Sequence, residues 1–400
     1  MTIKPISGIN FLIEFKFLVA CCQATPDKND IDFIEKQLKV LSIKQIILFS
    51  TKHAVLPILY TRLKKLAQAD KISSFTQLME TLDKHYQFYV KNNIQMSAQL
   101  LKMTQLLENN GYHTLAFKGP TLAQKAYGNI TYRQYVDLDI LVDENHVFKV
   151  ASLLKTEGYS TVKPLSLLQK STYLSSAKDF SLFHQGTHTE LHWRLFENKY
   201  NITLEHCLSK EHYQNVKIND QNIKTLENET LLVYLCLHGA KHIFNRLEWI
   251  CDIDRLIRCD TINWEKAASI ATQAHTKRSY LLGLSLAHYL FSTPIPLQII
   301  QEVSDISIQN LQEITLRHIN LESKETDVFK TNLTIFLFQS KLFDSNLEAL
   351  RFQLLTLFSV STTDCQTFNL PNTLSFLYIL LRPLRLIFSS LSHLLRFILR

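Results

Sequence analysis

Glycine is scarce in this sequence, with 8 residues in 400, whereas average usage near ~7% gives roughly 28. The shortage excludes collagen-like chains and flexible glycine linkers. It also excludes phosphate-binding loops built on several glycines, because neither GxGxxG nor GxxxxGK[ST] occurs. Five of the eight glycines lie between residues 111 and 186. We therefore expect the tight turns, and with them the chemistry, in residues 111–194.

Paired cysteines and membrane-spanning runs are also missing. The seven cysteines are scattered, odd in number and without a CxxC motif, which favours a reduced, cytoplasmic chain over a disulfide framework. No uninterrupted apolar run approaches the ~18–20 residues that cross a bilayer. The apolar run 9–22 is interrupted by Glu14 and Lys16, which indicates a buried helix and not a signal segment.

Acidic residues are absent after Asp364, although four arginines follow. These arginines supply four of the seven net positive charges of the chain. For the apolar, basic segment 374–400 two interpretations stay open. It lies peripherally on an anionic membrane surface, or it docks on the body as helices whose arginines extend to solvent. No basic stripe interleaved with aromatic residues is present, so no specific nucleic-acid partner is predicted.

Helical periodicity flanks a short mixed region. Apolar residues recur at helical spacing over 30–108 and 226–345. Between them, the pattern predicts an alternation of strands and helices that ends in a hairpin: strand 114–117, helix 120–127, strand 135–142, helix 144–156, strand 180–184 and strand 188–195.

These elements predict an α+β fold, with a small mixed sheet flanked by N- and C-terminal helical domains. The expected division is a helical domain (1–110), an α/β core (111–200), a second helical domain (201–345) and an apolar, basic helical tail (346–400).

Asp137 and Asp139 are the centre of the expected chemistry. On a strand, residues i and i+2 point to one face, and two carboxylates on an apolar strand are costly unless something neutralises them. Magnesium does this, being held by carboxylates and substrate phosphates. Glu190, on the second strand of the hairpin, can complete a site for two metal ions if that strand pairs beside the first. The alternative is a solvent-facing strand whose acids pair with lysine or arginine.

Lys118 and Gly119 form a strand-to-helix turn. A helix N-terminus that follows a glycine offers free N–H groups and a positive dipole to an anion, and Lys118 adds a charge suited to phosphate. Arg133, four residues before Asp137, can reach the same ligand or form a surface salt bridge.

The ordered motifs resemble the uncharacterised nucleotidyltransferase family of the polymerase-β superfamily. The segment 111–159 carries the family's KG, YG, DxD and GY landmarks, and the resemblance spans roughly residues 30–260. Further landmarks are the upstream Lys52, His53, Ala54, Val55, Leu56 and Pro57, the strand residues Glu190, His192, Trp193 and Arg194, and the helical His238, Gly239, His242, Trp249 and Asp252.

The resemblance implies a nucleotidyltransferase fold in which Asp137, Asp139 and Glu190 bind two Mg²⁺ ions, with Mn²⁺ as an alternative, and carry out catalysis. It also implies that the Gly119 turn holds a triphosphate. The wider superfamily has Gly-Ser or Gly-Gly in that turn, whereas Pro120 follows the glycine here. We therefore expect Lys118 to replace the missing phosphate contact.

The helix that contains His238 and His242 has two interpretations. Histidines at i and i+4 share one helical face, which is a spacing suited to zinc, but no H-E-x-x-H motif is present. The favoured interpretation is that this helix packs against the catalytic sheet and sets Lys241 or His242 near the nucleotide.

Two functional hypotheses follow. In the first, an acceptor hydroxyl attacks the α-phosphate of a nucleoside triphosphate such as ATP, and pyrophosphate leaves; the acceptor is a small molecule, a sugar or a protein. In the second, the chain is a non-catalytic module of the same fold that binds a partner protein or a membrane surface through its C-terminal tail.

Overall fold

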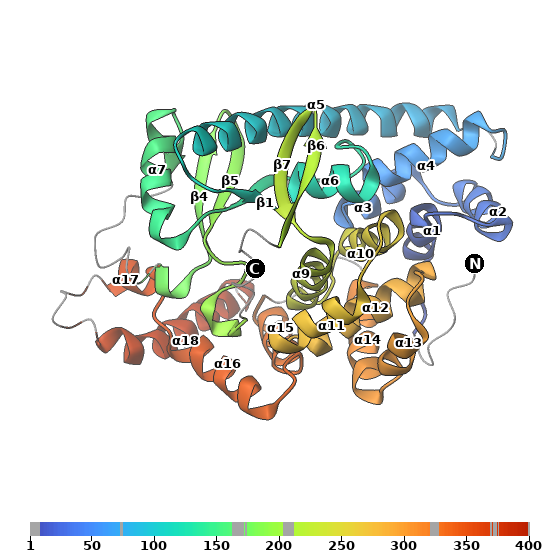
Figure 1. Ribbon diagram of the computed structural model, residues 1–400. Helices are drawn as coiled ribbons and strands as arrows, with labels where there is room; N and C mark the ends of the chain where they lie inside the picture. Colours follow the sequence, from blue (N-terminus) through green and yellow to red (C-terminus); the bar gives the residue numbers. More distant parts are fainter. Residues whose placement is uncertain are drawn as a thin grey trace.

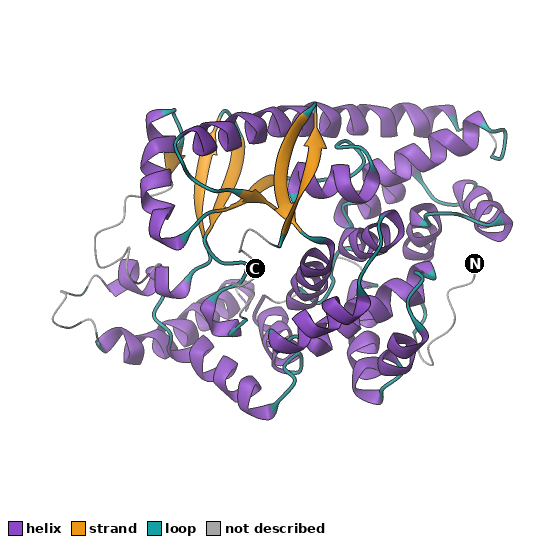
Figure 2. Ribbon diagram, in the orientation of Figure 1, coloured by secondary structure: helices purple, strands orange, loops and turns teal. Residues whose placement is uncertain are grey.

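The computed structural model describes residues 9–72, 75–161, 172, 174–202, 212–320, 328–368, 370, 374 and 376–398. In these residues helices dominate (Figure 2), and the strands all lie between Leu115 and Leu226. The N-terminal helices are α1 (Ile13–Cys22), α2 (Lys28–Leu38), α3 (Ile43–Lys52), α4 (Leu56–Gln68) and α5 (Thr76–Asn109). The central elements are β1 (Leu115–Ala116), α6 (Gly119–Tyr127), β2 (Asp137–Leu141), the 3₁₀ turn η1 (Glu144–His146), α7 (Val147–Thr156), β3 (Ser160–Thr161), β4 (Asp179–His184), β5 (Thr187–His192), the 3₁₀ turn η2 (Asn198–Tyr200), β6 (Tyr213–Ile218) and β7 (Gln221–Leu226). The C-terminal helices are α9 (Asn228–Lys241), α10 (Leu247–Cys259), α11 (Trp264–Gln273), α12 (Lys277–Phe291), α13 (Leu297–Val303), α14 (Ile306–Ile319), α15 (Val328–Ser340), α16 (Asn346–Phe358), α17 (Thr362–Phe368) and α18 (Leu377–Ile398).

Five strands form one mixed sheet in the order β1-β2-β5-β4-β3. The β2 and β5 strands run parallel, whereas the other neighbours in this sheet are antiparallel. The long helix α5 runs along the top of Figure 1 and contacts β2, while α7 contacts β5. The predicted strands and the predicted hairpin are confirmed, and so is the α+β class with its small mixed sheet.

A second, two-stranded sheet lies within residues 201–345, where the sequence predicted helices alone. Its strands β6 and β7 are antiparallel and join at Asn219 and Asp220, both with positive φ. Such φ values are typical of the two-residue turns that close β-hairpins. Because β7 packs against β1 and β6 packs against α6, the hairpin extends the strand-containing part of the fold as far as β7.

Two apolar clusters fill the interior. One joins the N-terminal helices to the helices α9–α14 and includes Phe15 and Phe17 of α1, which confirms that this N-terminal run is a buried helix. The other surrounds β2 and β5 and draws on α5, α7, β6 and β7. Helices α1–α4 and the start of α5 therefore share one core with α9–α14, and Figure 1 shows α1–α4 packed together with α10, α12, α13 and α14 at the right of the molecule.

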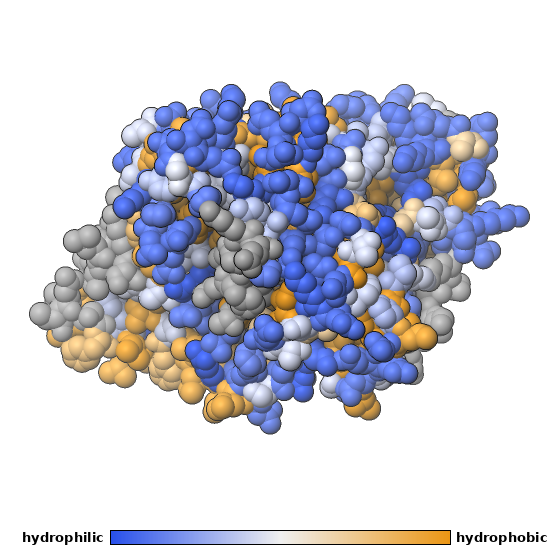
Figure 3. Space-filling view, in the orientation of Figure 1, coloured by the Kyte–Doolittle hydropathy of each residue, from blue (hydrophilic) through white to orange (hydrophobic). Residues whose placement is uncertain are grey.

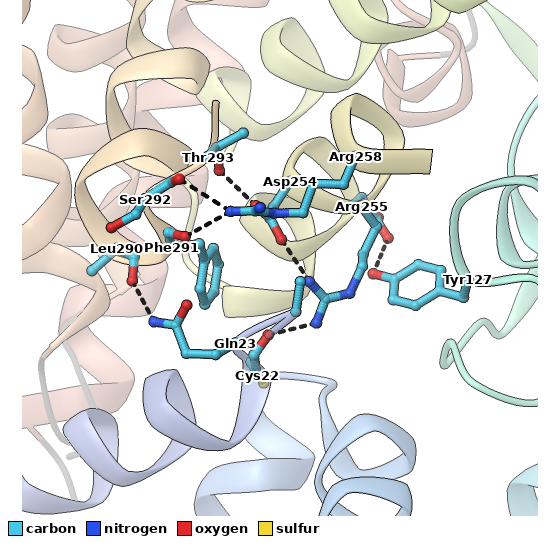
Figure 4. Close-up of polar contacts among 12 residues, drawn as sticks. Cys22, Gln23, Tyr127, Asp254, Arg255, Arg258, Leu290, Phe291, Ser292 and Thr293 are labelled. Carbon is cyan, nitrogen blue, oxygen red and sulfur yellow. Dashed lines mark hydrogen bonds and ion pairs between the residues drawn. The ribbon is translucent and has the colours of Figure 1, made fainter. Parts of the chain in front are cut away.

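Buried polar contacts fasten α10 to both sides of the shared core (Figure 4). Asp254 is fully buried and accepts hydrogen bonds from Arg258 Nε at 2.7 Å, Arg255 Nη1 at 2.6 Å and Thr293 Oγ1 at 2.7 Å. Arg255 also donates to the carbonyl oxygen of Cys22 at the end of α1, and Arg258 donates to two carbonyl oxygens at the end of α12. The carboxylate of Asp254 thus orients the two arginines that link α10 to the end of α1 and to the end of α12.

Gly239 in α9 gives a test of close packing. A Cβ at this position would lie 2.1 Å from Cε1 of Phe244, whose ring is fully buried. Gly239→Ala should gain about 1 kcal/mol of helix propensity but lose about 3 kcal/mol because the added methyl group overpacks the core and displaces a buried aromatic ring. We expect a net loss of about 2 kcal/mol in the free energy of unfolding, measured by urea denaturation.

The matched control for this prediction is a double-mutant cycle with Phe244→Leu. If the ring causes the loss, the alanine costs much less when the smaller side chain is present, because the overlap is gone. An equal cost of Gly239→Ala in both backgrounds contradicts the packing argument.

Candidate active site

Asp137, Asp139 and Glu190 meet where β2 and β5 run side by side. On β2, the two aspartates lie two residues apart and therefore share a face of the sheet. In the parallel register, Asp139 pairs with Glu190 and Asp137 pairs with His188. Because paired residues of neighbouring strands point to the same face, the structure brings all three carboxylates together.

Two overlapping sets of side chains could hold a metal ion. One consists of Asp137, His188 and Glu190, and the other of Asp139, Glu190 and His192; within each set the potential ligand atoms lie within 4.8 Å of one another. Carboxylate oxygens suit Mg²⁺ or Mn²⁺. In the described part of the chain, the buried Oδ2 of Asp139 has no hydrogen-bond partner. The donor atoms therefore fit a hard divalent cation.

Asp139 has two close nitrogen partners, from Lys118 and His192, that Asp137 lacks. Lys118 Nζ and His192 Nε2 lie 3.0 and 3.1 Å from Oδ1 of Asp139. Burial alone would raise the pKa of Asp139, but Lys118 and His192 lower it below its usual range. Burial and the charge of Asp139 instead raise the pKa of Asp137. One carboxylate of the pair is thus short of counter-charge, which a bound cation would supply.

Glu190 forms an ion pair with a second lysine, Lys178. Lys178 Nζ lies 3.1 Å from Oε2 of Glu190 and also contacts Asp179, and His192 Nε2 lies 3.2 Å from the same glutamate oxygen. Although burial opposes it, the hydrogen bond from His192 and the charge of Lys178 lower the pKa of Glu190 to about 2. Glu190 is therefore ionised at neutral pH, as a metal ligand or a proton acceptor must be.

The turn at Lys118 and Gly119 sets the start of α6 beside these acids. Gly119 has a φ of +54°, and a Cβ there would lie 3.3 Å from the carbonyl oxygen of Asp137, so glycine fits without strain. The first amides of a helix lack intrahelical partners and lie at the positive end of its dipole. Pro120 has no N–H, and the hydroxyl of Thr121 is bonded to two backbone carbonyl oxygens. An anion at this turn would therefore have, among the described residues of the turn, only the remaining amides and Lys118 as its donors.

Arg133 is not placed beside the carboxylates of β2. Its side chain is buried, and Nε and Nη2 donate to both carboxylate oxygens of Asp252 at 2.9 to 3.1 Å. Glu248 Oε1 lies 3.9 Å from the same Nε. Arg133 thus forms a salt bridge, but a buried one, that links the loop before β2 to α10.

Lys241 and His242 lie at the end of α9. Lys241 Nζ is bonded to both carboxylate oxygens of Glu197, at 2.9 and 2.8 Å. The ring of His242 lies 5.1 Å from that of His238 and 5.4 Å from that of Trp249. Burial and the charge of Lys241 lower the pKa of His242 to about 4, so the imidazole is neutral at physiological pH.

Comparison with known proteins shows which family this chain belongs to. Residues 41–292, more than half of the chain, match the sequence profile of the family described as "Uncharacterised nucleotidyltransferase". The chain belongs to this family. The predicted resemblance is confirmed, and membership makes the protein a transferase. The three acids, the Lys-Gly turn and α9 of this nucleotidyltransferase all lie within the matched residues.

Two solved structures are similar to the nucleotidyltransferase in part. The antibiotic-resistance factor ANT(2'')-Ia is 9% identical, with 45% of this chain and 91% of that chain covered and a TM-score of 0.34. An antigenic nucleotidyltransferase-like protein from Paracoccidioides brasiliensis is 14% identical, with 50% and 93% covered and a TM-score of 0.30. No curated protein matches the chain in sequence.

Three side chains near the acids of this nucleotidyltransferase were not assigned a role from the sequence. His188 and His192 lie two residues before and after Glu190 on β5, so the alternation T-H-T-E-L-H was a usable signal. Lys178 carries no such signal. It reaches Glu190 because β4 pairs antiparallel with β5, which places the start of β4, next to Lys178, beside the end of β5.

Proposed function

We propose that the chain transfers a nucleoside monophosphate from a nucleoside triphosphate to an acceptor hydroxyl. The acceptor oxygen forms a bond to the α-phosphorus, the bond from that phosphorus to the α,β-bridging oxygen breaks, and pyrophosphate leaves. The observation that carries the proposal is the parallel register of β2 and β5. This register sets Asp139 beside Glu190 and Asp137 beside His188, so three acids from two distant segments share one face of the sheet. Oδ2 of Asp139 is buried and has no hydrogen-bond partner among the described residues.

We assign Asp137, Asp139 and Glu190 as ligands of two Mg²⁺ ions, for which Mn²⁺ is an alternative. When bound, such ions neutralise phosphate charge and favour ionisation of an attacking hydroxyl. The charge balance of the site supports the assignment. Counting Asp179, the site has four carboxylates and two lysines: Lys118 contacts Asp139, and Lys178 contacts Asp179 and Glu190. Burial and the charge of Asp139 raise the pKa of Asp137, which has no such contact among the described residues.

The chain's own groups have separate tasks in this proposal. Glu190 is ionised, and it accepts the proton of the acceptor hydroxyl. Lys118 and the first amides of α6 hold the triphosphate and stabilise charge on the departing pyrophosphate. Burial opposes the charged form of Lys118, but Asp139 raises the pKa of this lysine above its usual value. Lys118 therefore stays positively charged at the start of α6.

The nucleoside end is assigned to a line of rings on α9 and α10. Tyr234 lies under Lys118 Nζ, 5.8 Å from it, and its ring is 5.8 Å from that of His238. His238 in turn lies 5.1 Å from His242 and 5.3 Å from Trp249. The last three rings are partly exposed. Because nucleobases stack on such rings, this line leads from the phosphate turn to a surface suited to the base, beside Lys241.

Equilibrium binding of the four ribonucleoside triphosphates tests the proposed function. With Mg²⁺ present, isothermal titration calorimetry should give a dissociation constant between about 1 μM and 1 mM for at least one of them, as is usual for enzyme substrates. Because the carboxylates repel a triphosphate without the metal, EDTA should weaken this binding at least about tenfold.

A matched variant separates site binding from non-specific binding in this titration. Lys118→Met removes the charge at the phosphate turn and should weaken binding, whereas Lys39→Met removes an exposed charge on the far N-terminal helices and should not. If none of the four nucleotides binds at millimolar concentration, the alternative of a non-catalytic module replaces the enzyme.

A further inference from the structure

An apolar surface covers the C-terminal helices. Among the described residues, more than half of the exposed large hydrophobic side chains lie on α16, on α18 and on the short segment between α17 and α18. In Figure 3 they form the broad orange area at the lower left, where Figure 1 places α16 and α18. We call this area the C-terminal apolar face; its residues are Leu347, Leu350, Leu354, Leu357, Phe358, Leu374, Phe376, Ile379, Leu380, Leu384, Ile387 and Phe388.

The spacing shows that this surface is continuous along each helix. On α16, Leu347, Leu350 and Leu354 recur at i, i+3 and i+7, and on α18 Leu380 and Leu384 are four residues apart. These positions share one helical face. The two helices pack against each other, so their stripes lie side by side. Soluble proteins rarely expose so large an apolar area unless it binds something.

Two arginines of α18, Arg382 and Arg385, point away from this face. Arg382 Nη1 and Arg385 Nε lie 2.7 and 2.5 Å from the two oxygens of Asp364, which is fully buried. Arg382 also donates to the carbonyl oxygen of Thr356 on α16. An ordinary surface helix has its charges outward and its leucines inward. The arrangement is reversed here, which leaves the apolar side uncovered.

The charges around the face indicate what covers it. From the start of α16 to the C-terminus the sequence has five arginines and two acids. Of these acids, Asp364 is neutralised by two arginines, and Glu348 is paired with His275. Arg351 is exposed on α16. Arg396 and Arg400 of the predicted tail lie outside the residues whose side chains the structure describes.

We propose that the C-terminal apolar face docks on an anionic lipid surface. The leucine, isoleucine and phenylalanine side chains enter the boundary between headgroups and acyl chains, while exposed Arg351 and the net positive charge of the segment are attracted to the lipid charge. A second copy of the chain would bring two faces with the same positive excess together, so charge disfavours it. Among the described residues no helix is long and apolar enough to cross a membrane, and both helices therefore lie in the plane of the surface.

Vesicle co-sedimentation of the full chain tests this proposal. We expect the protein to pellet with vesicles of phosphatidylcholine and phosphatidylglycerol and to bind pure phosphatidylcholine at least about tenfold more weakly. The double variant Leu354→Asp/Leu380→Asp should lower the bound fraction at least about tenfold. Both leucines are about half-exposed or more, so circular dichroism and the melting temperature should stay those of the wild type.

The matched control is Leu297→Asp/Ile306→Asp. These side chains are 77% and 73% exposed but lie on α13 and α14, away from the face. This variant should bind vesicles like the wild type, and so should Asp137→Asn, because docking does not depend on catalysis. Three results overturn the proposal: no binding to anionic vesicles, equal loss in the control, or a dimer in analytical ultracentrifugation that Leu354→Asp/Leu380→Asp dissociates.

Discussion

Asp137→Asn should lower the rate of nucleotidyl transfer by about 10²–10³-fold, the usual cost of removing one group that stabilises charge in a transition state. The variant loses a carboxylate that is already short of counter-charge, so a divalent ion would be held less tightly. No salt bridge joins Asp137 to another described residue, and the fold should therefore be unaffected. The measurement is pyrophosphate release with the triphosphate and acceptor that the wild type uses.

The comparison for this prediction is Asp220→Asn, the same chemical change at the exposed turn of β6 and β7. It should keep the wild-type rate. Asp139→Asn should be at least as inactive as Asp137→Asn, but it also removes the negative charge that Lys118 and His192 contact, so part of its effect is structural. If Asp137→Asn kept the wild-type rate, the assignment of the three acids as metal ligands in catalysis would be wrong.

Asp252→Ala should destabilise the protein by about 3–5 kcal/mol, because it leaves a buried charge without its partner. Arg133 is 6% exposed and makes three hydrogen bonds to this carboxylate, and Tyr127 donates a fourth at 2.8 Å. Glu248 is 3.9 Å away and cannot replace these bonds. Urea denaturation measures the loss.

An exposed pair provides the control for this stability prediction. Glu313 and Arg317 are partners at i and i+4 on α14, with side chains 38% and 51% exposed, and Glu313→Ala should cost only about 0.3–0.5 kcal/mol. The double variant Arg133→Met/Asp252→Leu should regain most of the stability, since it removes both buried charges. A cost of Asp252→Ala near that of Glu313→Ala would show that the buried pair contributes little.

Local patterns in the sequence were enough to predict β1, β2, β4 and β5, and to single out the acids that β2 and β5 bring together. Alternation and apolar runs mark β2 and β5, and a glycine-proline pair marks the start of α6. The β6–β7 hairpin was missed although Val216, Ile218 and Ile223 alternate around a two-residue polar turn. The alternation covers only a few residues, whereas the helical periodicity over 226–345 is long, and the whole region 201–345 was therefore predicted to be helical.

Contacts between distant segments were beyond sequence reasoning. Nothing local to Arg133 indicates that its partner is Asp252, which lies 119 residues later. The same limit applies to Lys178 and Glu190, whose meeting depends on how β4 pairs with β5. A residue type and its spacing indicate which chemistry is available, but the partner of a long charged side chain depends on packing of the whole chain.

The core shared by the first and the later helices has a consequence for synthesis on the ribosome. The backbone N–H of Leu12 donates to Asn320, 308 residues further along, and α1 is also fastened to α10 and α12. At 5–20 residues per second, translation needs about 15–60 s to supply these partners. The early helices α2, α3 and α4 can cover part of α1 at once, but the side of α1 that bonds to α10 and α12 stays exposed until those helices have emerged from the ribosome.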